Sequence, residues 1–121
     1  ALDALGDGCD FAYIHVESPD ECGHRGEMEN KIRSIELIDK EILTPLLAEL
    51  PRFEDYAVMV LPDHPTPLSI RTHSSTPVPY LIYRSNAEQE SGVGCFSEQA
   101  AKATGRFIPE GHTLMKHFLQ R

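Results

Sequence analysis

The segment from residue 56 to residue 73 reads YAVMVLPDHPTPLSIRTH, and it decides the fold more than any other part of the chain. Its first part, Tyr56–Leu61, is a continuous apolar run of the length expected for a strand buried on both faces. Pro65 and Pro67 cannot donate to a β-ladder, so the strand must end before them. The loop that follows carries three side chains able to bind a metal, namely Asp63, His64 and His73.

Two further strands and a long helix are predicted on either side of this segment. Phe11–Val16 and Val78–Tyr83 are β-prone runs bounded by turn-forming residues. Between residues 27 and 50 apolar side chains recur at helical spacing, and Pro45 should kink that helix or restart it near Thr44. The periodic positions are Ile32, Ile35, Ile38, Ile42, Leu46 and Leu50.

The order of these elements predicts an α/β fold, with a mostly parallel sheet and flanking helices. A long helix between two strands implies a right-handed parallel crossover. Short helices are predicted over Ser97–Ala103, which Ser97 would cap, and over Thr113–Leu119. In such sheets ligands gather at the carboxyl ends of strands, which is where the candidate ligands lie.

The chain start indicates a piece of a longer protein. Ala1–Leu5 is typical of the end of a helix, with Gly6 and Gly8 as stop signals, and there is no initiator Met. We therefore expect residues 1–121 to form a single partial domain, the C-terminal part of its parent.

Composition narrows the function classes. A net charge of −8 in 121 residues disfavours nucleic-acid binding, which depends on clustered Lys and Arg. No apolar run approaches the roughly 20 residues needed to cross a bilayer, and no secretory leader is visible. The cysteines, Cys9, Cys22 and Cys95, show no pairing pattern typical of metal or redox sites. These features predict a cytoplasmic protein that binds neither nucleic acid nor membrane.

A second candidate ligand segment follows the first predicted strand. It runs from Asp20 to Gly26, is predicted to be a polar loop, and places Asp20 and His24 four residues apart. A lone Asp at a strand end is more often a turn or helix cap. Together with His73, however, Asp20 and His24 make a three-ligand set that leaves a coordination position open, as catalytic sites require.

The pair Asp63 and His64 has two readings. Adjacent residues of a regular strand point to opposite faces, so the two side chains converge only if the strand ends there. The alternative is an exposed turn with a surface histidine. Arg71 is the candidate for contacting a substrate phosphate or carboxylate through its fork of donors, with a salt bridge within the loop as the alternative. Of the remaining histidines, His15 is predicted to pack inside, and His112 and His117 to lie on the surface.

The ligand types favour phosphoryl chemistry. Two divalent ions roughly 3.5–4 Å apart can clamp a transferring phosphoryl group. Mixed carboxylate and imidazole ligands suit manganese or zinc better than calcium. The five candidate ligands are more than one open metal site requires and fewer than two complete sites require. This number agrees with further ligands in a missing N-terminal part. We expect two divalent ions, manganese before zinc, magnesium or cobalt.

These residues resemble the C-terminal part of the archaeal-type cofactor-independent phosphoglycerate mutases, within the alkaline phosphatase superfamily. The similarity runs through Asp10–His24, the Lys31–Asp39 helix, Pro62–Ser69 and Arg71–Pro79, and it weakens after Tyr83. The long spaced combination is specific to that family, whereas either motif alone would not be. The resemblance implies an alkaline-phosphatase-like core, of which this chain would be the C-terminal portion.

The resemblance also implies roles for the ligands. Asp20, His24 and His73 would hold one metal, and Asp63 and His64 would bind a second, completed by an N-terminal Asp and a nucleophilic Ser outside this chain. That Ser would carry the phosphoryl group while 3-phosphoglycerate and 2-phosphoglycerate interconvert. Without the nucleophile, the chain alone would not be an active mutase.

Two alternatives remain open at the level of sequence. Related proteins assigned as homoserine kinases, and phosphatases of the same superfamily, could share these metal loops. The chain could instead be a non-catalytic metal-binding or interaction module. In either case sheet surface that the rest of the protein would cover should be exposed, and it should promote self-association.

Overall fold

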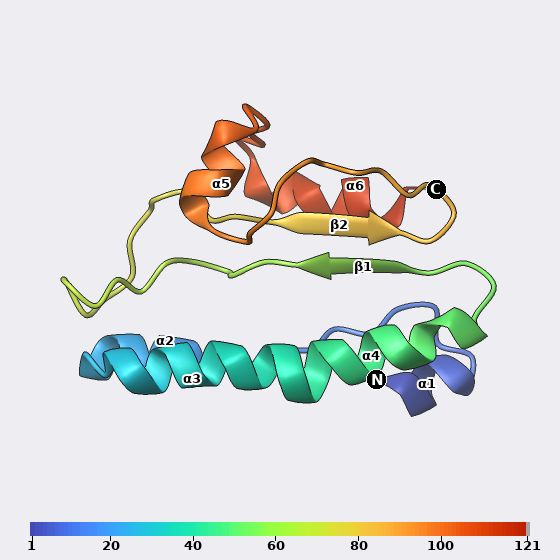
Figure 1. Ribbon diagram of the computed structural model, residues 1–121, viewed down its shortest axis with the longest axis horizontal. Helices are drawn as coiled ribbons and strands as arrows, with labels where there is room; N and C mark the ends of the chain where they lie inside the picture. Colours follow the sequence, from blue (N-terminus) through green and yellow to red (C-terminus); the bar gives the residue numbers. More distant parts are fainter. Residues whose placement is uncertain (121) are drawn as a thin grey trace. The chain divides into compact units, whose positions relative to one another are not determined.

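The computed structural model describes residues 1–120 (Figure 1). The chain divides into two compact units. The first contains residues 1–54 together with 66–74, and the second contains residues 55–65 together with those from 75 onward. The candidate ligand His73 therefore belongs to the same unit as Asp20 and His24, although the chain passes through the second unit to reach it.

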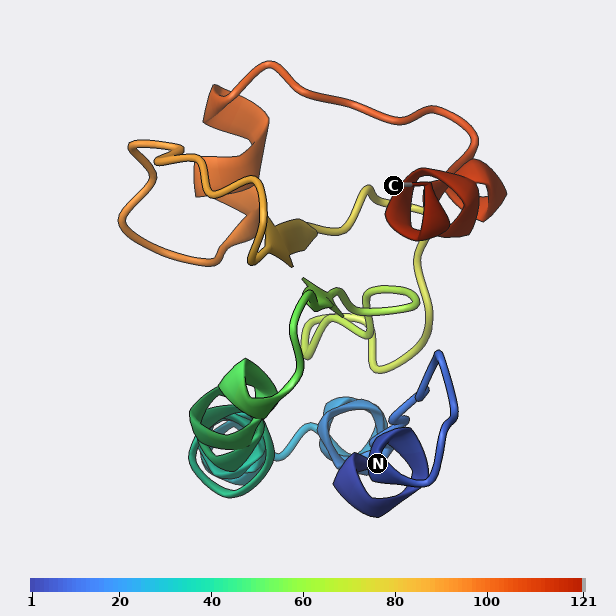
Figure 2. The same cartoon turned by 90° about the vertical axis from the view of Figure 1, so that its right-hand side faces the viewer.

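The first unit is helical. Its elements are α1 (Leu2–Gly6), α2 (Ser18–Arg25), α3 (Met28–Ile38), the π-helix η1 (Asp39–Leu43), α4 (Thr44–Glu49) and the 3₁₀-helix η2 (Leu50–Arg52). Helices α2 and α3 lie side by side in both cartoon views (Figures 1 and 2). Gly26, with φ of 71°, ends α2 and allows the sharp reversal into α3.

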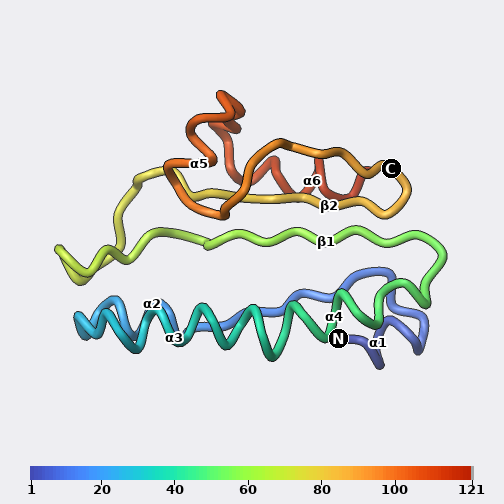
Figure 3. Tube along the Cα trace, in the orientation of Figure 1, coloured from blue at the N-terminus to red at the C-terminus, as the bar shows by residue number. Residues whose placement is uncertain are grey.

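The long helix predicted from residue 27 to residue 50 is confirmed. The helical backbone runs on through α3, η1 and α4, which the tube in Figure 3 shows as one continuous coil. As predicted, the α-helix restarts at Thr44, where α4 begins, and the backbone stays helical there because Thr44 keeps helical dihedrals. The backbone widens into the π-helix just before the proline, where an α-helical hydrogen bond to the carbonyl of residue 41 could not form.

The prediction of a polar loop from Asp20 to Gly26 is wrong, because these residues belong mainly to helix α2. The segment is short and polar, so it has no clear apolar periodicity from which a helix could be predicted. Its terminal signals were nevertheless present: Pro19 in the first turn, Asp20 and Glu21 beside the positive end of the helix dipole, and Gly26 at its end.

The strand predicted at Phe11–Val16 is also not formed. The segment joins no β-ladder with any residue from 1 to 120, and Phe11, Tyr13 and Ile14 are exposed. His15, predicted to pack inside, is exposed as well. A strand buried on both faces needs partner strands on either side, and the described part of the chain supplies none here.

The second unit contains the sheet, and its pairing differs from the predicted mostly parallel arrangement. Strand β1 (Ala57–Val60) pairs antiparallel with β2 (Leu81–Arg84), in a register that opposes Val60 and Leu81. A parallel partner needs a crossover, usually helical, and the described residues between these strands form no helix. The strand predicted at Val78–Tyr83 starts later because Pro79 cannot donate to a ladder.

Both predicted C-terminal helices are confirmed. Helix α5 (Glu98–Ala103) is capped by Ser97, whose hydroxyl accepts a hydrogen bond from the backbone N–H of Ala100 at 3.2 Å. Helix α6 (Leu114–Leu119) follows the 3₁₀-helix η3 (Gly111–Thr113). Arg84 at the end of β2 donates to the backbone carbonyls of His117 and Phe118, both at 2.8 Å, and so ties α6 to the sheet.

Little apolar surface is buried within either unit. Among the described residues, Leu50 and Leu114 are the large apolar side chains that are buried. Many others, including Met28, Ile32 and Ile35 along α3, are exposed. In residues 1–120, every helix is too short or too polar to cross a bilayer.

Candidate metal centre

Helix α2 brings the first two candidate ligands together. Asp20 and His24 are four residues apart, so they project from one face of the helix on successive turns. His24 Nε2 lies 3.4 Å from Asp20 Oδ2. The spacing that suggested a metal site therefore acts through helix geometry, and not through the polar loop that the sequence predicted.

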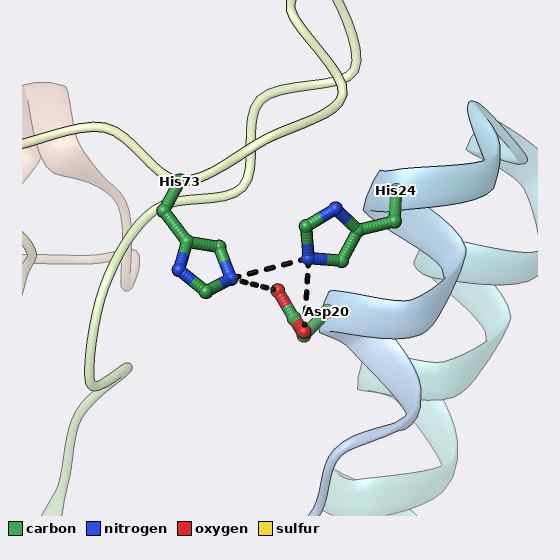
Figure 4. A group of neighbouring side chains, drawn as sticks. All are labelled: Asp20, His24 and His73. Carbon is green, nitrogen blue, oxygen red and sulfur yellow. Dashed lines mark hydrogen bonds and ion pairs between the residues drawn. The ribbon is translucent and has the colours of Figure 1, made fainter.

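His73 completes the cluster from the segment 66–74. Its Nε2 lies 3.1 Å from His24 Nε2 and 3.4 Å from Asp20 Oδ1. Figure 4 shows the two imidazoles and the carboxylate pointing toward one common volume. The three side chains remain partly open to solvent, with 35% exposure for Asp20, 41% for His24 and 53% for His73.

The orientation of His24 is fixed by a backbone acceptor. Its Nδ1 lies 3.0 Å from the carbonyl oxygen of Arg71, which can only accept a hydrogen bond. In the neutral ring Nδ1 therefore carries the proton, and Nε2 presents its lone pair to the cluster. Arg71 has φ of 51°, a left-handed conformation rare outside glycine, which turns the chain at the point where this carbonyl faces His24.

The spacing of these atoms fits a bound metal ion. Ligand atoms about 2.0–2.1 Å from a tetrahedral ion lie about 3.3 Å from one another. The two Nε2 atoms lie 3.1 Å apart, and each lies 3.4 Å from a different oxygen of Asp20, distances close to that value. One ligand atom from each residue lies within 4.8 Å of the other two. Two imidazoles and one carboxylate suit a divalent transition metal and leave coordination positions for water or substrate.

Asp63 and His64 lie in a bend of the second unit, after β1 has ended at Val60. Their side chains converge, with Asp63 Oδ2 at 3.3 Å from His64 Nε2. Asp63 Oδ1 also accepts a hydrogen bond from the backbone N–H of His64 at 3.0 Å. The early end of the strand therefore allows two adjacent residues to present an oxygen and a nitrogen together, as the prolines suggested.

Arg71 lies in the first unit, beside the cluster. Its guanidinium lies against Gly26, where a Cβ atom would come within 2.6 Å of Nε. Its backbone carbonyl orients His24, a contact that the sequence did not predict. Arg71 is exposed, so its guanidinium donors could meet an anionic group.

Three residues contact one another beside the cluster, and the contacts of Thr66 and Lys31 were not predicted from the sequence. Thr66 is only 4% exposed, and its hydroxyl donates a hydrogen bond to Asp20 Oδ1. Lys31 Nζ donates to the carbonyl of Thr66 at 2.7 Å. Gly23 allows the close approach, since a Cβ there would lie 2.7 Å from the Thr66 carbonyl oxygen. The sequence feature that could have pointed to Thr66 is its position between Pro65 and Pro67, two residues after the candidate ligand His64.

Comparison with known proteins finds relatives whose names are closely similar. A protein of Geobacter sulfurreducens named "Probable 2,3-bisphosphoglycerate-independent phosphoglycerate mutase" is 38% identical over 121 residues, 100% of this chain and 30% of its own length. A protein named 2,3-bisphosphoglycerate-independent phosphoglycerate mutase in Methanothrix thermoacetophila is 45% identical over 117 residues, 96% of this chain and 29% of its own. One of the same name in Methanosarcina acetivorans is 43% identical over 94 residues, 77% of this chain and 24% of its own.

The resemblance noted from the motifs is thereby confirmed, and the chain spans no more than about a third of the length of these relatives. No solved structure gives a significant match. The family match extends over residues 1–120 and so includes every candidate ligand described above. This chain belongs to the Metalloenzyme superfamily.

Proposed function

We propose that the chain is the C-terminal part of a metal-dependent phosphoglycerate mutase, which interconverts 3-phosphoglycerate and 2-phosphoglycerate through a phosphoserine formed outside these residues. The cluster of Asp20, His24 and His73 carries the proposal, because it joins a helix and a distant loop at metal-ligand spacing. The names of the relatives supply the substrate.

We assign one divalent ion to Asp20, His24 and His73, and we assign Asp63 and His64 to a second, with manganese as the expected metal. Asp63 and His64 offer only an oxygen and a nitrogen, so that second ion needs ligands from elsewhere in the protein. When bound, such ions polarise phosphoryl oxygens and stabilise the charge that develops during transfer.

The residues of the chain itself have separable tasks in this proposal. The Arg71 carbonyl holds His24 with Nε2 toward the cluster, and Asp20 supplies the negative charge that partly offsets that of the cation. The Arg71 guanidinium would bind a phosphate or carboxylate of the substrate through paired N–H donors. None of these groups is a nucleophile, which is why the covalent step is assigned to the rest of the enzyme.

We also propose how this chain folds within the intact protein. Within the full-length enzyme, residues 1–121 would be part of one domain, and Phe11–Val16 would become a strand of a mostly parallel sheet. The exposure of its apolar side chains supports this, because a run of that kind is stable when flanked by other strands. We further propose a cytoplasmic location and no interaction with nucleic acid.

Calorimetric titration of the chain with Mn²⁺ and Zn²⁺ tests the metal assignment. We expect saturable binding that is lost in His73→Ala and retained in His112→Ala, an exposed histidine outside the cluster. Equal binding by wild type and His73→Ala would contradict the assignment. If the isolated chain binds no metal, repeating the titration on the full-length protein separates an incomplete site from a wrong one.

The substrate is tested on the full-length enzyme. Supplied with 3-phosphoglycerate and Mn²⁺, it should produce 2-phosphoglycerate, and the His73→Ala variant should not. Release of free phosphate instead would indicate a phosphatase, and phosphorylation of homoserine from an added donor would indicate a kinase. Either of these results without mutase activity would overturn the proposal while leaving the metal site intact.

A further inference from the structure

A buried hydroxyl group contacts the carboxylate of the cluster. Thr66 donates from Oγ1 to Asp20 Oδ1, and Thr66 is among the few polar residues of the described chain that are buried. We propose that Thr66 is a positioning residue for the metal ligand Asp20, a role that rests on the proposed metal assignment. It would act on the metal through the carboxylate and would not bind the ion itself.

The backbone of Thr66 is held firmly enough for its hydroxyl to orient another group. Lys31 of α3 donates to its carbonyl at 2.7 Å. Gly23 of α2 lets the segment approach so closely that any added Cβ would lie 2.9 Å from Thr66 Cγ2. Two helices therefore fix the position of Thr66, and Asp20 lies on one of them, next to Gly23 along the helix face.

The hydrogen bond from Thr66 to Asp20 should affect metal binding, because a carboxylate can bind a metal ion in several orientations. Its two oxygens offer about four lone-pair sites, and an exposed Asp rotates freely among them. With Oδ1 held by Thr66, the carboxylate is fixed in one rotation: Oδ1 lies 3.4 Å from His73 Nε2 and Oδ2 lies 3.4 Å from His24 Nε2. The ligand is thus oriented before a cation arrives, so less conformational entropy is lost on binding. Hydrogen bonds to metal ligands commonly change metal affinity by about 10–100-fold.

A purely structural role makes a different prediction. If Thr66 only anchors the segment 66–74 to α2, its carbonyl and methyl contacts would suffice, and Thr66→Val would keep both. If the hydroxyl orients Asp20, Thr66→Val should weaken metal binding while the fold persists, and Thr66→Ser should restore it. The Asp20 side chain is 35% exposed, so water can hydrogen-bond to its carboxylate when the hydroxyl is removed and the fold need not be lost.

The test is titration with Mn²⁺ alone, followed by calorimetry and by the electron paramagnetic resonance of the free ion. It is carried out on whichever form, the chain or the full-length protein, binds the metal. We expect Thr66→Val to bind about 10–100-fold more weakly than wild type. Thr66→Ser should bind within a few-fold of wild type. Thr104→Val, at an exposed threonine of the second unit, serves as the matched control.

Circular dichroism and thermal unfolding of each variant show whether the fold is retained. Affinity equal to wild type in Thr66→Val would overturn the proposal and leave the metal assignment standing. Weak binding by Thr66→Ser equal to that of Thr66→Val would also overturn it. A wild-type protein that binds no Mn²⁺ in either form would remove the metal assignment and this inference together.

Discussion

At the scale of single residues, the candidate site depends on close approaches that few side chains permit. Asp20 and His24 are neighbours through the helix repeat, but His73 reaches His24 across a separation of 49 residues. That contact requires the segment 66–74 to lie directly on α2. Gly23, placed between the two ligands, is the residue that leaves room for it.

We expect Gly23→Ala to destabilise the first unit. An alanine inside a helix normally adds stability, by up to about 1 kcal/mol relative to glycine. Here its Cβ would meet the Thr66 carbonyl oxygen at 2.7 Å, and backbone atoms cannot move aside as a flexible side chain can. Overpacking of this kind costs about 1–3 kcal/mol. Thermal and denaturant unfolding should show a net loss of stability, accompanied by weaker Mn²⁺ binding.

Gly111→Ala is the matched control for that variant. Gly111 opens η3, its φ is not positive, and a Cβ added to it would have no neighbouring atom within 4 Å. Its substitution should be nearly neutral. A Gly23→Ala protein more stable than wild type would show that α2 and the segment 66–74 do not pack as described.

At the scale of elements, helix ends and apolar periodicity carried different parts of the prediction. Helix α5 has a serine cap and was predicted correctly, and the long helix through α3 and α4 was visible from its apolar repeat. Helix α2 is too short and too polar for a repeat to appear. Its boundaries were nevertheless marked by Pro19 and Gly26, the residues that favour the first turn and the left-handed end of a helix.

Helix α6 depends on a contact from the sheet. Arg84 donates to two carbonyls at its C-terminal end, which the helix itself leaves unsatisfied. We expect Arg84→Met, which keeps an unbranched apolar stem but removes the donors, to cost about 1.5–3 kcal/mol, the range for hydrogen bonds that involve a charged group. Amide hydrogen exchange should rise across α6 more than across β1 and β2.

Arg106→Met provides the comparison for Arg84→Met. Arg106 is an exposed residue between α5 and η3, so its replacement should leave exchange in α6 unchanged. If α6 is equally protected in Arg84→Met, the helix is held by the buried Leu114 rather than by the arginine.

At the scale of the whole molecule, the chain exposes more apolar surface than an independent protein usually does. Met28, Ile32 and Ile35 form an exposed stripe on α3, and within residues 1–120 the two-stranded sheet leaves both strands with an unpaired edge. Surfaces of this kind favour association with other chains. The relatives are more than three times as long as the matched segment, so they contain enough further chain to cover such surfaces.

We therefore predict that the isolated chain self-associates. Sedimentation velocity over a range of micromolar concentrations should show a rising average mass. The double variant Ile32→Glu and Ile35→Glu should lower that mass, whereas Lys40→Glu, which changes the net charge by the same amount, should not. A clean monomer of the wild-type chain at every concentration would contradict the prediction.

The sequence by itself determined the local features: the apolar run of β1, the long helix, the capped α5, and the ligand types that point to a divalent metal. Each of these depends on neighbours within a few residues, so each is visible in one dimension. The tertiary structure alone decided that β1 and β2 pair antiparallel, that Phe11–Val16 forms no β-strand among residues 1–120, and that Thr66 donates to Asp20. These depend on contacts between distant segments, whose free energy comes from packing and hydrogen bonding that no local pattern of residues encodes.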